Sequence, residues 1–229
     1  MNKVVLLFVL FLTSVNLAFS GIDIDTVKFT EDGKGKKYHV ELSYPKIRNA
    51  STESTRCFNK VISDFVDSKK VEFMKDVTAG DYDDERPFEF YVNYDVSYSD
   101  IHFISLVIYT YYYTGGAHGS TIAHSFNYDL DYNRSLKLSD LFEGKYLNII
   151  SDYCIKEIMK DDEYADSEWV RTGAGPSAEN FEAFTLNDEG LVIHFQQYQV
   201  LPYSAGMPDV LIPQSFLKNV VRKDGLLSR

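Results

Sequence analysis

Alternating apolar and polar residues mark several short strands along the chain. The clearest run covers residues 88–98, where apolar or aromatic residues occupy every second position, the pattern of a half-buried strand. Residues 101–113 are apolar or aromatic at both parities, which predicts a strand covered on both faces. Because only Ser99 and Asp100 separate the two runs, we expect an antiparallel pair. Weaker patterns predict further strands at 22–29, 38–44, 120–130, 181–186, 191–198 and 210–212.

Two other stretches carry apolar residues at helical spacing. Residues 51–75 are expected to form a helix with Ser51 as its N-cap and Glu53 in its first turn. Residues 146–159 are expected to form a second amphipathic helix, and a last helix is expected to begin at Gln214. The apolar stripes of the two longer helices are Phe58, Val61, Ile62 and Phe65, and Leu147, Ile150, Cys154 and Ile158.

Several residues indicate where these elements end. Pro45 is expected to end the strand at 38–44, and Ser139 or Asp140 to cap a short helical turn. The acidic run 81–85 and the Gly-Ala-Gly-Pro segment 173–176 predict loops. Strands grouped as hairpins, with helices inserted rather than regularly alternating, predict an α+β fold of mainly antiparallel sheets with packed helices.

The first twenty residues have the pattern of a secretory signal peptide. Lys3 precedes nine apolar residues at 4–12, and the small residues Ala18 and Ser20 stand just before Gly21. The apolar block would span only about 14 Å as a helix, against a hydrocarbon core of about 30 Å, so it is too short for a membrane anchor. We therefore expect cleavage after Ser20, a secreted or extracytoplasmic protein, and no membrane span after cleavage.

The composition is that of a folded protein, with 45% apolar and 25% charged residues. The 23 basic and 34 acidic residues give a net charge of −11, and loss of Lys3 with the signal peptide would make it −12. Such a charge argues against non-specific nucleic-acid binding, which needs cations facing phosphates, and favours cationic partners.

Two cysteines fall on the predicted helices. In an oxidising compartment Cys57 and Cys154 could form one disulfide. The alternative is a pair of buried free thiols that behave as small hydrophobic side chains. The sequence leaves both readings open.

Metal and nucleophile motifs are weak. His118 and His124, if joined by an extended segment, would lie about 20 Å apart, too far to share an ion. A calcium-loop spacing begins at Asp129, but Arg134 stands where the loop needs glycine, which favours a simple turn. There is no Gly-x-Ser-x-Gly elbow. We therefore expect no metal and no cofactor.

Aromatic residues cluster beside a glycine-rich turn. Tyr109 and the run 111–113 come just before the turn 115–119. These rings could stack on sugars or on a protein partner, or they could belong to the strand core, since tyrosine is a strong strand former. His118, flanked by glycines, could lock the turn through a hydrogen bond or contact a ligand.

An ordered series of short motifs runs through the second half of the chain. In order, the motifs are Gly115-Gly116-Ala117-His118-Gly119, Asn127-Tyr128-Asp129, Leu138-Ser139-Asp140-Leu141-Phe142, Tyr146-Leu147, Phe184-Thr185-Leu186, Asp188-Glu189-Gly190-Leu191, Tyr198, Pro202-Tyr203, Gly206 and Ile212-Pro213. With these motifs the chain resembles domain-of-unknown-function family 3298. Residues 25–114 resemble the companion family 4163, the N-terminal domain of peptidoglycan deacetylases. The resemblance implies two intimately joined α+β subdomains, 21–114 and 115–229.

The resemblance also implies a functional setting. Such modules occur beside deacetylase catalytic domains and as the outer, lysozyme-sensing part of membrane-bound anti-sigma factors. We expect neither a catalytic domain nor a sigma-binding segment here, so neither activity carries over. We predict a non-enzymatic cell-envelope module that binds peptidoglycan or a cationic protein such as lysozyme. The predicted binding residues are Tyr111, Tyr113, Gly115, Gly116, His118, Asp129, Tyr198 and Tyr203. The alternative is a small envelope hydrolase or deacetylase-like enzyme with an unrecognised site around His118, Tyr113 and Asp129.

Overall fold

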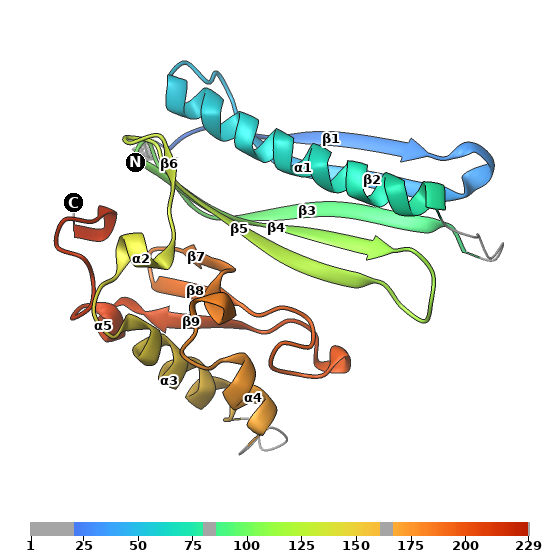
Figure 1. Ribbon diagram of the computed structural model, residues 1–229. Helices are drawn as coiled ribbons and strands as arrows, with labels where there is room; N and C mark the ends of the chain where they lie inside the picture. Colours follow the sequence, from blue (N-terminus) through green and yellow to red (C-terminus); the bar gives the residue numbers. More distant parts are fainter. Residues whose placement is uncertain (1–20, 80–85, 161–166, 229) are drawn as a thin grey trace, which may run out of the picture.

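Six strands form one large sheet and three strands form a second, smaller sheet (Figure 1). The computed structural model describes residues 21–79, 86–160 and 167–228. The predicted signal peptide, residues 1–20, and the acidic run at 81–85 lie outside the described residues. The predicted α+β fold with mainly antiparallel sheets is confirmed, because β2 and β3 form the one parallel pair among the strands described.

The large sheet has its strands in chain order. Because β2 and β3 are parallel, the chain must return between them through a crossover, and helix α1 supplies it. The strands lie on both sides of residue 115, so the two predicted subdomains share this sheet, and the boundary itself stays a prediction. The strands are β1 (Ile24–Asp32), β2 (Tyr38–Ile47), β3 (Phe88–Ser99), β4 (Phe103–Tyr113), β5 (Ser120–Asp129) and β6 (Arg134–Ser135).

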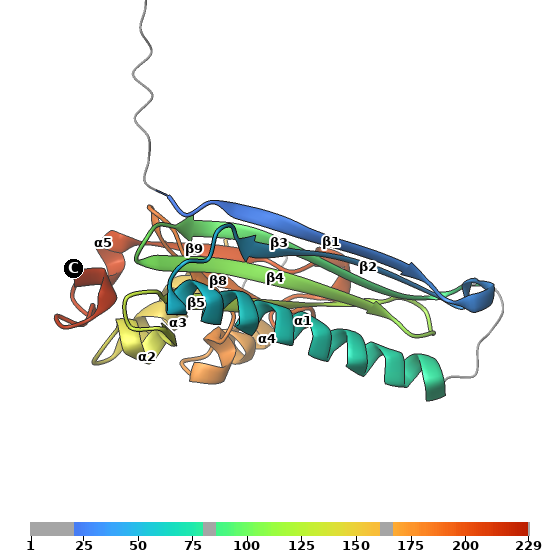
Figure 2. The ribbon, with the colours of Figure 1, turned by 90° about the horizontal axis from the view of Figure 1, so that it is seen from above.

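Helix α1 (Glu53–Ala79) covers one face of the large sheet. It runs along the sheet in the general direction of the long strands (Figure 2). Thr52 rather than Ser51 caps it, because the Thr52 hydroxyl accepts the N–H of Thr55 at 3.2 Å. Of the predicted stripe, Phe58 and Ile62 are buried, and Val61 and Phe65 are partly buried. The residues of α1 that are buried against the sheet repeat at four- and seven-residue intervals, which is helical spacing: Phe58, Ile62, Val66, Phe73 and Val77.

The small sheet packs on the other face of the large sheet, and helix α3 packs on the small sheet in turn, which gives four layers (Figure 1). Both faces of β4 are therefore covered over Phe103–Ile108, as its apolar pattern predicts. The remaining elements are β7 (Phe184–Leu186), β8 (Gly190–His194), β9 (Asp209–Pro213), α2 (Leu138–Leu141), α3 (Tyr146–Ile158), α4 (Glu168–Gly173) and α5 (Gln214–Leu217).

Several predicted boundaries are wrong. Strand β2 continues through Pro45, because the β3 ladder already ends at Leu42 and the missing N–H costs no bond there. Helix α2 begins before Ser139, and the Asp140 carboxylate accepts the N–H of Lys137 instead of capping from outside. The strands predicted at 181–186 and 191–198 are shorter, since a 3-10 turn occupies Ala178–Phe181 and β8 ends at His194.

Helix α4 forms where the sequence pattern predicted no helix, and it ends at Gly173, the first residue of the predicted loop. Ser167 caps it by accepting the N–H of Val170, and Val170 is fully buried. The burial of Val170 anchors α4 in the hydrophobic core between the small sheet and α3.

Both cysteines are free thiols, so the disulfide alternative does not hold. Cys154 is buried in the core around the small sheet, whereas Cys57 packs against the core under α1. Burial raises the pKa of the Cys154 thiol to about 12, so it behaves as an inert hydrophobic side chain. Among the described residues, no helix combines the length and apolar character needed to cross a bilayer.

A buried polar junction joins the two sheets. Ser105 on β4 donates to the side-chain oxygen of Asn127 on β5 at 2.6 Å, and the Asn127 amide donates to the carbonyl of Phe184 on β7 at 2.8 Å. The N–H of Leu186 closes the circuit by donating to Ser105 at 2.8 Å. Every polar group in this junction is therefore satisfied while the surrounding side chains stay apolar.

The outer edge of β5 is covered in a related way. The side-chain amide of Gln196 accepts the N–H of Ala123 at 2.9 Å and donates to the Ala123 carbonyl at 2.8 Å. The Gln197 oxygen accepts the N–H of Thr121 at 2.9 Å. These glutamines take the place of a neighbouring strand, so the edge offers fewer open bonds to other chains.

Removing the Asn127 amide tests this junction. Asn127→Ala should lower the free energy of unfolding by roughly 2 kcal/mol, because it leaves the Ser105 hydroxyl and the Phe184 carbonyl buried without this partner. Urea unfolding measures the loss. Asn93→Ala, at an exposed position of the same sheet, is the control and should change stability by less than about 0.5 kcal/mol. Equal effects of the two substitutions would contradict the junction.

His124 makes stability depend on pH. Its imidazole lies against Phe65, with ring centres 4.8 Å apart, and burial lowers its pKa from 6.5 to about 4. The unfolded chain thus takes up a proton at a higher pH than the folded chain does. The contribution of His124 to the free energy of unfolding is therefore complete above the pKa that its imidazole has in the unfolded chain, and it is lost as the pH falls towards about 4.

His124→Gln removes this titration and keeps a polar group opposite Thr110, which lies 3.1 Å from the imidazole. Between pH 7 and pH 4 the variant should lose roughly 1–2 kcal/mol less unfolding free energy than the wild type, allowing for the partial exposure of the ring. Urea unfolding across this range measures the difference. Parallel pH profiles for the two proteins would show that His124 does not titrate as described.

Candidate functional site

Aromatic side chains gather where the β4–β5 connection meets the segment that follows β8. The rings of His118 and Tyr203 stack with centres 4.0 Å apart and planes 25° from parallel. Tyr198 lies beside them, 5.7 Å from Tyr203, and its hydroxyl is 3.4 Å from His118 Nε2. Trp169 on α4 joins the group by donating its indole N–H to the Tyr198 carbonyl at 2.9 Å. We call these four residues the aromatic corner.

Glycines shape the turn that carries His118. Gly115 and Gly116 have φ of +105° and +88°, which L side chains rarely adopt. A Cβ at Gly119 would collide with the Tyr111 ring, so only glycine lets that ring pack against the backbone. The Gly119 carbonyl then accepts the Tyr203 hydroxyl at 3.3 Å. The glycine-rich turn is therefore what brings β4 close to the aromatic corner.

An arginine lies at the same end of the sheet. The Arg86 guanidinium lies over the Tyr113 ring at 3.8 Å and donates to the Tyr111 hydroxyl at 3.3 Å and to Glu89 at 2.7 Å. These bonds raise the pKa of Arg86, which stays charged at any relevant pH. The Tyr113 hydroxyl in turn donates to the Gly116 carbonyl at 3.1 Å.

Tyr198 is the strained residue of the aromatic corner. Its φ is +61°, a left-handed conformation that is uncommon for a bulky side chain, and half of its surface is exposed. Trp169 is likewise 42% exposed. A strained backbone that holds an aromatic ring towards solvent is the kind of outlier that clusters at binding sites.

The structure brings together seven of the eight predicted site residues and separates one. Asp129 pairs with Phe103 at one end of the β4–β5 ladder, whereas Ser120, next to Gly119, pairs with Tyr112 at the other end. Asp129 is buried, and its carboxylate accepts the N–H groups of Asp131 and Tyr132, as in a simple turn. The seven residues that meet are Tyr111, Tyr113, Gly115, Gly116, His118, Tyr198 and Tyr203.

Sequence reasoning missed Trp169 and Arg86. Trp169 is the single tryptophan of the chain, and that rarity was the available signal. Arg86 directly follows the acidic run 81–85, where a basic residue attracts little notice.

The structure offers no support for a shared histidine site. His118 is exposed at the aromatic corner, whereas His124 points towards α1 and contacts Phe65. Within the part of the chain that the structure describes, no three His, Cys, Asp or Glu side chains are grouped so that they could hold a metal ion.

A hydroxyl–imidazole–carboxylate chain occurs inside the small sheet. Thr185 Oγ1 is 2.9 Å from His194 Nε2, and His194 Nδ1 is 2.8 Å from the Asp209 carboxylate. The order of groups is that of a hydrolase triad, but Thr185 has no exposed surface, so a substrate carbonyl could not reach its hydroxyl. The chain of bonds instead ties β7, β8 and β9 together.

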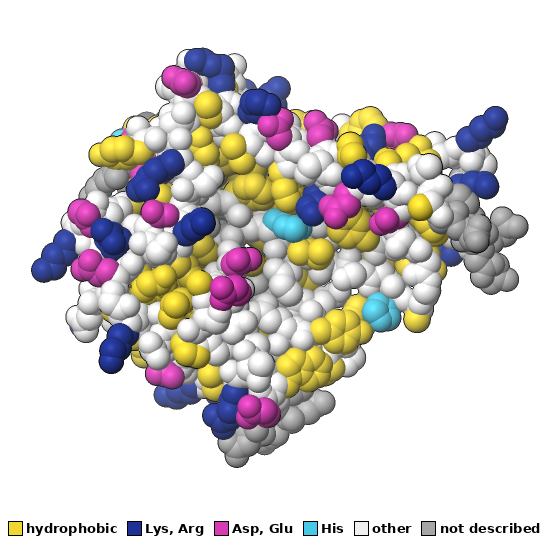
Figure 3. Space-filling view, viewed as in Figure 1, with side chains coloured by type: hydrophobic (Ala, Val, Ile, Leu, Met, Phe, Trp, Pro, Cys, Tyr) yellow, Lys and Arg dark blue, Asp and Glu magenta, His cyan; other side chains and the backbone are white. Residues whose placement is uncertain are grey.

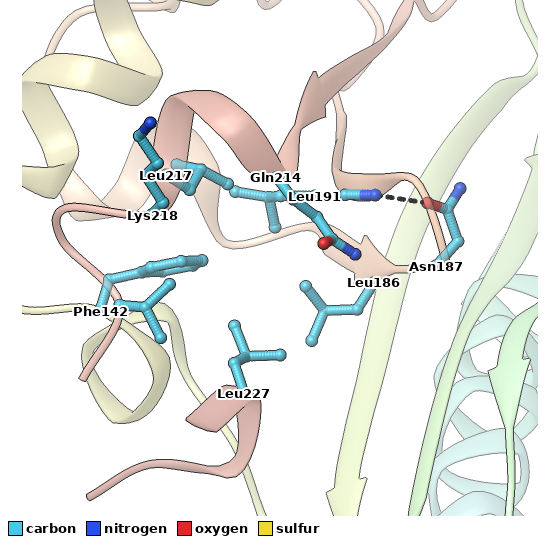
Figure 4. Close-up of a pocket in the computed structure, with 10 residues that line it drawn as sticks. Phe142, Leu186, Asn187, Leu191, Gln214, Leu217, Lys218 and Leu227 are labelled. Carbon is cyan, nitrogen blue, oxygen red and sulfur yellow. Dashed lines mark hydrogen bonds between the residues drawn. The ribbon is translucent and has the colours of Figure 1, made fainter. Parts of the chain in front are cut away.

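A cavity of about 360 Å³ lies at the opposite end of the small sheet (Figure 4). Leu186 and Leu191 form one wall, Leu217 and Phe142 form another, and Leu227 closes one side. The turn between β7 and β8 borders it, whereas the aromatic corner follows the other end of β8. The two features are therefore separate.

Charge is mixed on the face seen in Figure 1. The space-filling view shows basic and acidic side chains interspersed, with hydrophobic patches between them (Figure 3). Although the chain carries a net charge of −11, this face has no continuous acidic field.

Comparisons with known proteins divide the chain into two matched regions. Residues 139–215 match the family described as "Protein of unknown function (DUF3298)", which confirms that resemblance there. Residues 31–121 match the family described as "Deacetylase PdaC", so the companion domain bears that name rather than the number 4163, although it is the same kind of domain.

Two curated relatives cover most of the chain. The peptidoglycan-N-acetylmuramic acid deacetylase PdaC of Bacillus subtilis is 28% identical over 195 residues, which are 82% of this chain. The chain spans only 40% of the length of PdaC. The immunogenic protein MPT64 of Mycobacterium tuberculosis is 22% identical and matches 94% of this chain and 98% of its own length.

A solved structure supports the fold. A DUF3298 family protein from Pseudomonas aeruginosa superposes with a TM-score of 0.67 at 15% identity and covers 88% of this chain and 94% of its own. The chain is thus similar to a PdaC-like region followed by a DUF3298-like region, in one α+β fold.

Proposed function

We propose that this chain is an extracytoplasmic module of the cell envelope that binds the glycan of peptidoglycan through its aromatic corner. The observation that carries the proposal is that the rings of Tyr198 and Trp169 are both exposed, and that Tyr198 keeps its position although its positive φ strains the backbone. The similarity of residues 31–121 to a peptidoglycan deacetylase supports the location and the ligand class.

The chemistry of the corner suits a sugar. A pyranose ring has an apolar face of C–H groups that packs on an aromatic ring, and an equatorial rim of hydroxyl and acetamido groups that need hydrogen bonds. The exposed faces of Tyr198 and Trp169 can take the apolar face, while the exposed imidazole of His118 supplies a polar group beside them. These contacts orient a ligand without any reaction.

A cationic protein is the other predicted partner, and its support is the net charge of −11. That charge acts at long range and does not single out the corner. The Arg86–Glu89 ion pair at this end of the sheet is neutral overall. The aromatic geometry therefore favours glycan over a cationic protein.

Co-sedimentation with purified peptidoglycan tests the proposal. Wild type should pellet with it at low and at moderate salt, because stacking contacts are not screened. Trp169→Ala and Tyr198→Gly should bind about tenfold more weakly, the loss of roughly one aromatic contact. Glycine at position 198 adopts the positive φ without strain, which offsets part of the packing lost with the ring, and thermal unfolding of the variant checks that it stays folded.

Two exposed aromatic residues outside the corner serve as matched controls. Tyr132→Ala and Phe216→Ala remove side chains that are 64% and 54% exposed, and both should leave binding unchanged. Wild-type protein that stays in the supernatant at both salt concentrations would refute the proposal. Retention on immobilised lysozyme but not on peptidoglycan would replace the glycan by a cationic protein.

A further inference from the structure

A row of aromatic rings leads away from the aromatic corner across the large sheet. Tyr111, which packs against Gly119, stacks on Tyr91 of β3 with ring centres 5.6 Å apart and planes 26° from parallel. Tyr91 in turn lies 5.7 Å from the His39 ring on β2. The rings of His39, Tyr91 and Tyr111 thus form a series that is connected to the corner through Gly119, whose carbonyl accepts the Tyr203 hydroxyl.

Strand register places this row on one face of the sheet. Tyr91 pairs with Glu41 on one side and with Tyr111 on the other, and directly paired residues point to the same face. His39 shares the face of Glu41 because it lies two residues away on β2. The intervening residues, such as Phe90 and Tyr112, point to the opposite face and stack under α1.

The small sheet does not reach this end of the face. On this face of β4, the small sheet and its flanking residues cover the strand from Ser105 to Tyr109, which packs beside Met207, and Tyr111 is the next residue on the same face. In Figure 1 the long strands extend past the small sheet towards the β4–β5 connection. Glu41 and Asn93, which flank the row, are exposed.

Polar groups border the rings. Arg86 and Glu89 lie beside Tyr111, Glu41 lies opposite Tyr91 on β2, and Asn93 is the next residue of β3 on the same face. Rings flanked by carboxylate, amide and guanidinium groups match the alternation of apolar faces and polar rims along a polysaccharide.

We infer that His39, Tyr91, Tyr111, Tyr203, His118 and Tyr198 form one aromatic track that binds a β-1,4-linked amino-sugar strand several residues long. The inference rests on the proposed function and deepens it, because it assigns an extended strand rather than a single sugar or a peptide. The ring spacings of 5.6 and 5.7 Å resemble the rise per sugar of such a strand. The three neighbouring strands β2, β3 and β4 carry the ligand across about 10 Å of sheet before it reaches the corner.

Cross-strand stacking alone would explain Tyr91 and Tyr111 as a pair that stabilises the sheet. That role predicts a loss of stability and no effect on ligand length. The track predicts that a residue far from the corner matters only when the ligand is long enough to reach it. Length dependence therefore separates the two roles.

Affinities for N-acetylglucosamine β-1,4 oligomers, from the dimer to the hexamer, test the track by isothermal titration calorimetry. Wild type should bind the hexamer at least about tenfold more tightly than the dimer, since each added stacking contact contributes roughly a factor of two to ten and the hexamer reaches several more of them. Tyr91→Thr, which keeps a strand-forming side chain, and His39→Ala should bind the hexamer several-fold more weakly and the dimer as wild type does. Tyr132→Ala is the matched control and should bind both ligands as wild type does.

Each outcome of these titrations either supports or overturns the aromatic track. Loss of the length dependence in Tyr91→Thr, with thermal unfolding close to wild type, supports the track. Equal affinity of wild type for dimer and hexamer, or an unchanged length dependence in both variants, overturns the track while leaving the glycan-binding corner in place. If wild type binds neither the oligomers nor purified peptidoglycan, the proposed function fails and the track fails with it.

Discussion

The side-chain amides of Asn127 and Gln196 hold the small sheet and the segment that follows β8 against the large sheet, and the placement of the aromatic corner depends on that contact. Asn127 closes a buried circuit between β4, β5 and β7, while Gln196 pairs with the outer edge of β5. Because both amides bond to the backbone, they fix register as well as distance. The segment after β8 therefore reaches the β4–β5 connection in one position.

This fixed position explains how the aromatic corner tolerates strain. Tyr198 with φ of +61° costs free energy that an isolated loop would release by rearranging. Here Gln197 holds the neighbouring backbone to Thr121, and the Trp169 indole bonds to the Tyr198 carbonyl. Because these two bonds hold the backbone at Tyr198 and at its neighbour Gln197, Tyr198 cannot move to a less strained conformation. Its ring therefore stays exposed in one orientation.

Local pattern was enough to predict much of the fold. Strands β3 and β4 follow from alternation and from a doubly apolar run, and α1 follows from its apolar stripe. Pattern failed where tertiary contacts overrule local preference. Pro45 stays in β2 because the neighbouring ladder has already ended, and α4 forms in a polar stretch because burial of Val170 stabilises it.

The candidate site was less accessible from sequence. Its residues came from motifs and aromatic clustering, since a contact such as His118 with Tyr198 joins positions 80 residues apart and leaves no periodic signal. Asp129 was misplaced relative to them because the run of β5 separates it from the glycine turn. Trp169 and Arg86 could not be assigned to the group before the packing of α4 and β3 was known.

The alternation within each strand does predict which residues share a face of the sheet. Residues 39 and 41 lie on one face of β2, residues 89, 91 and 93 lie on one face of β3, and the pairing of β3 with β4 adds Tyr111 to this face. A surface built by parity across neighbouring strands is flat and extended, and such a surface suits a linear polymer better than a compact ligand, which needs a concave pocket.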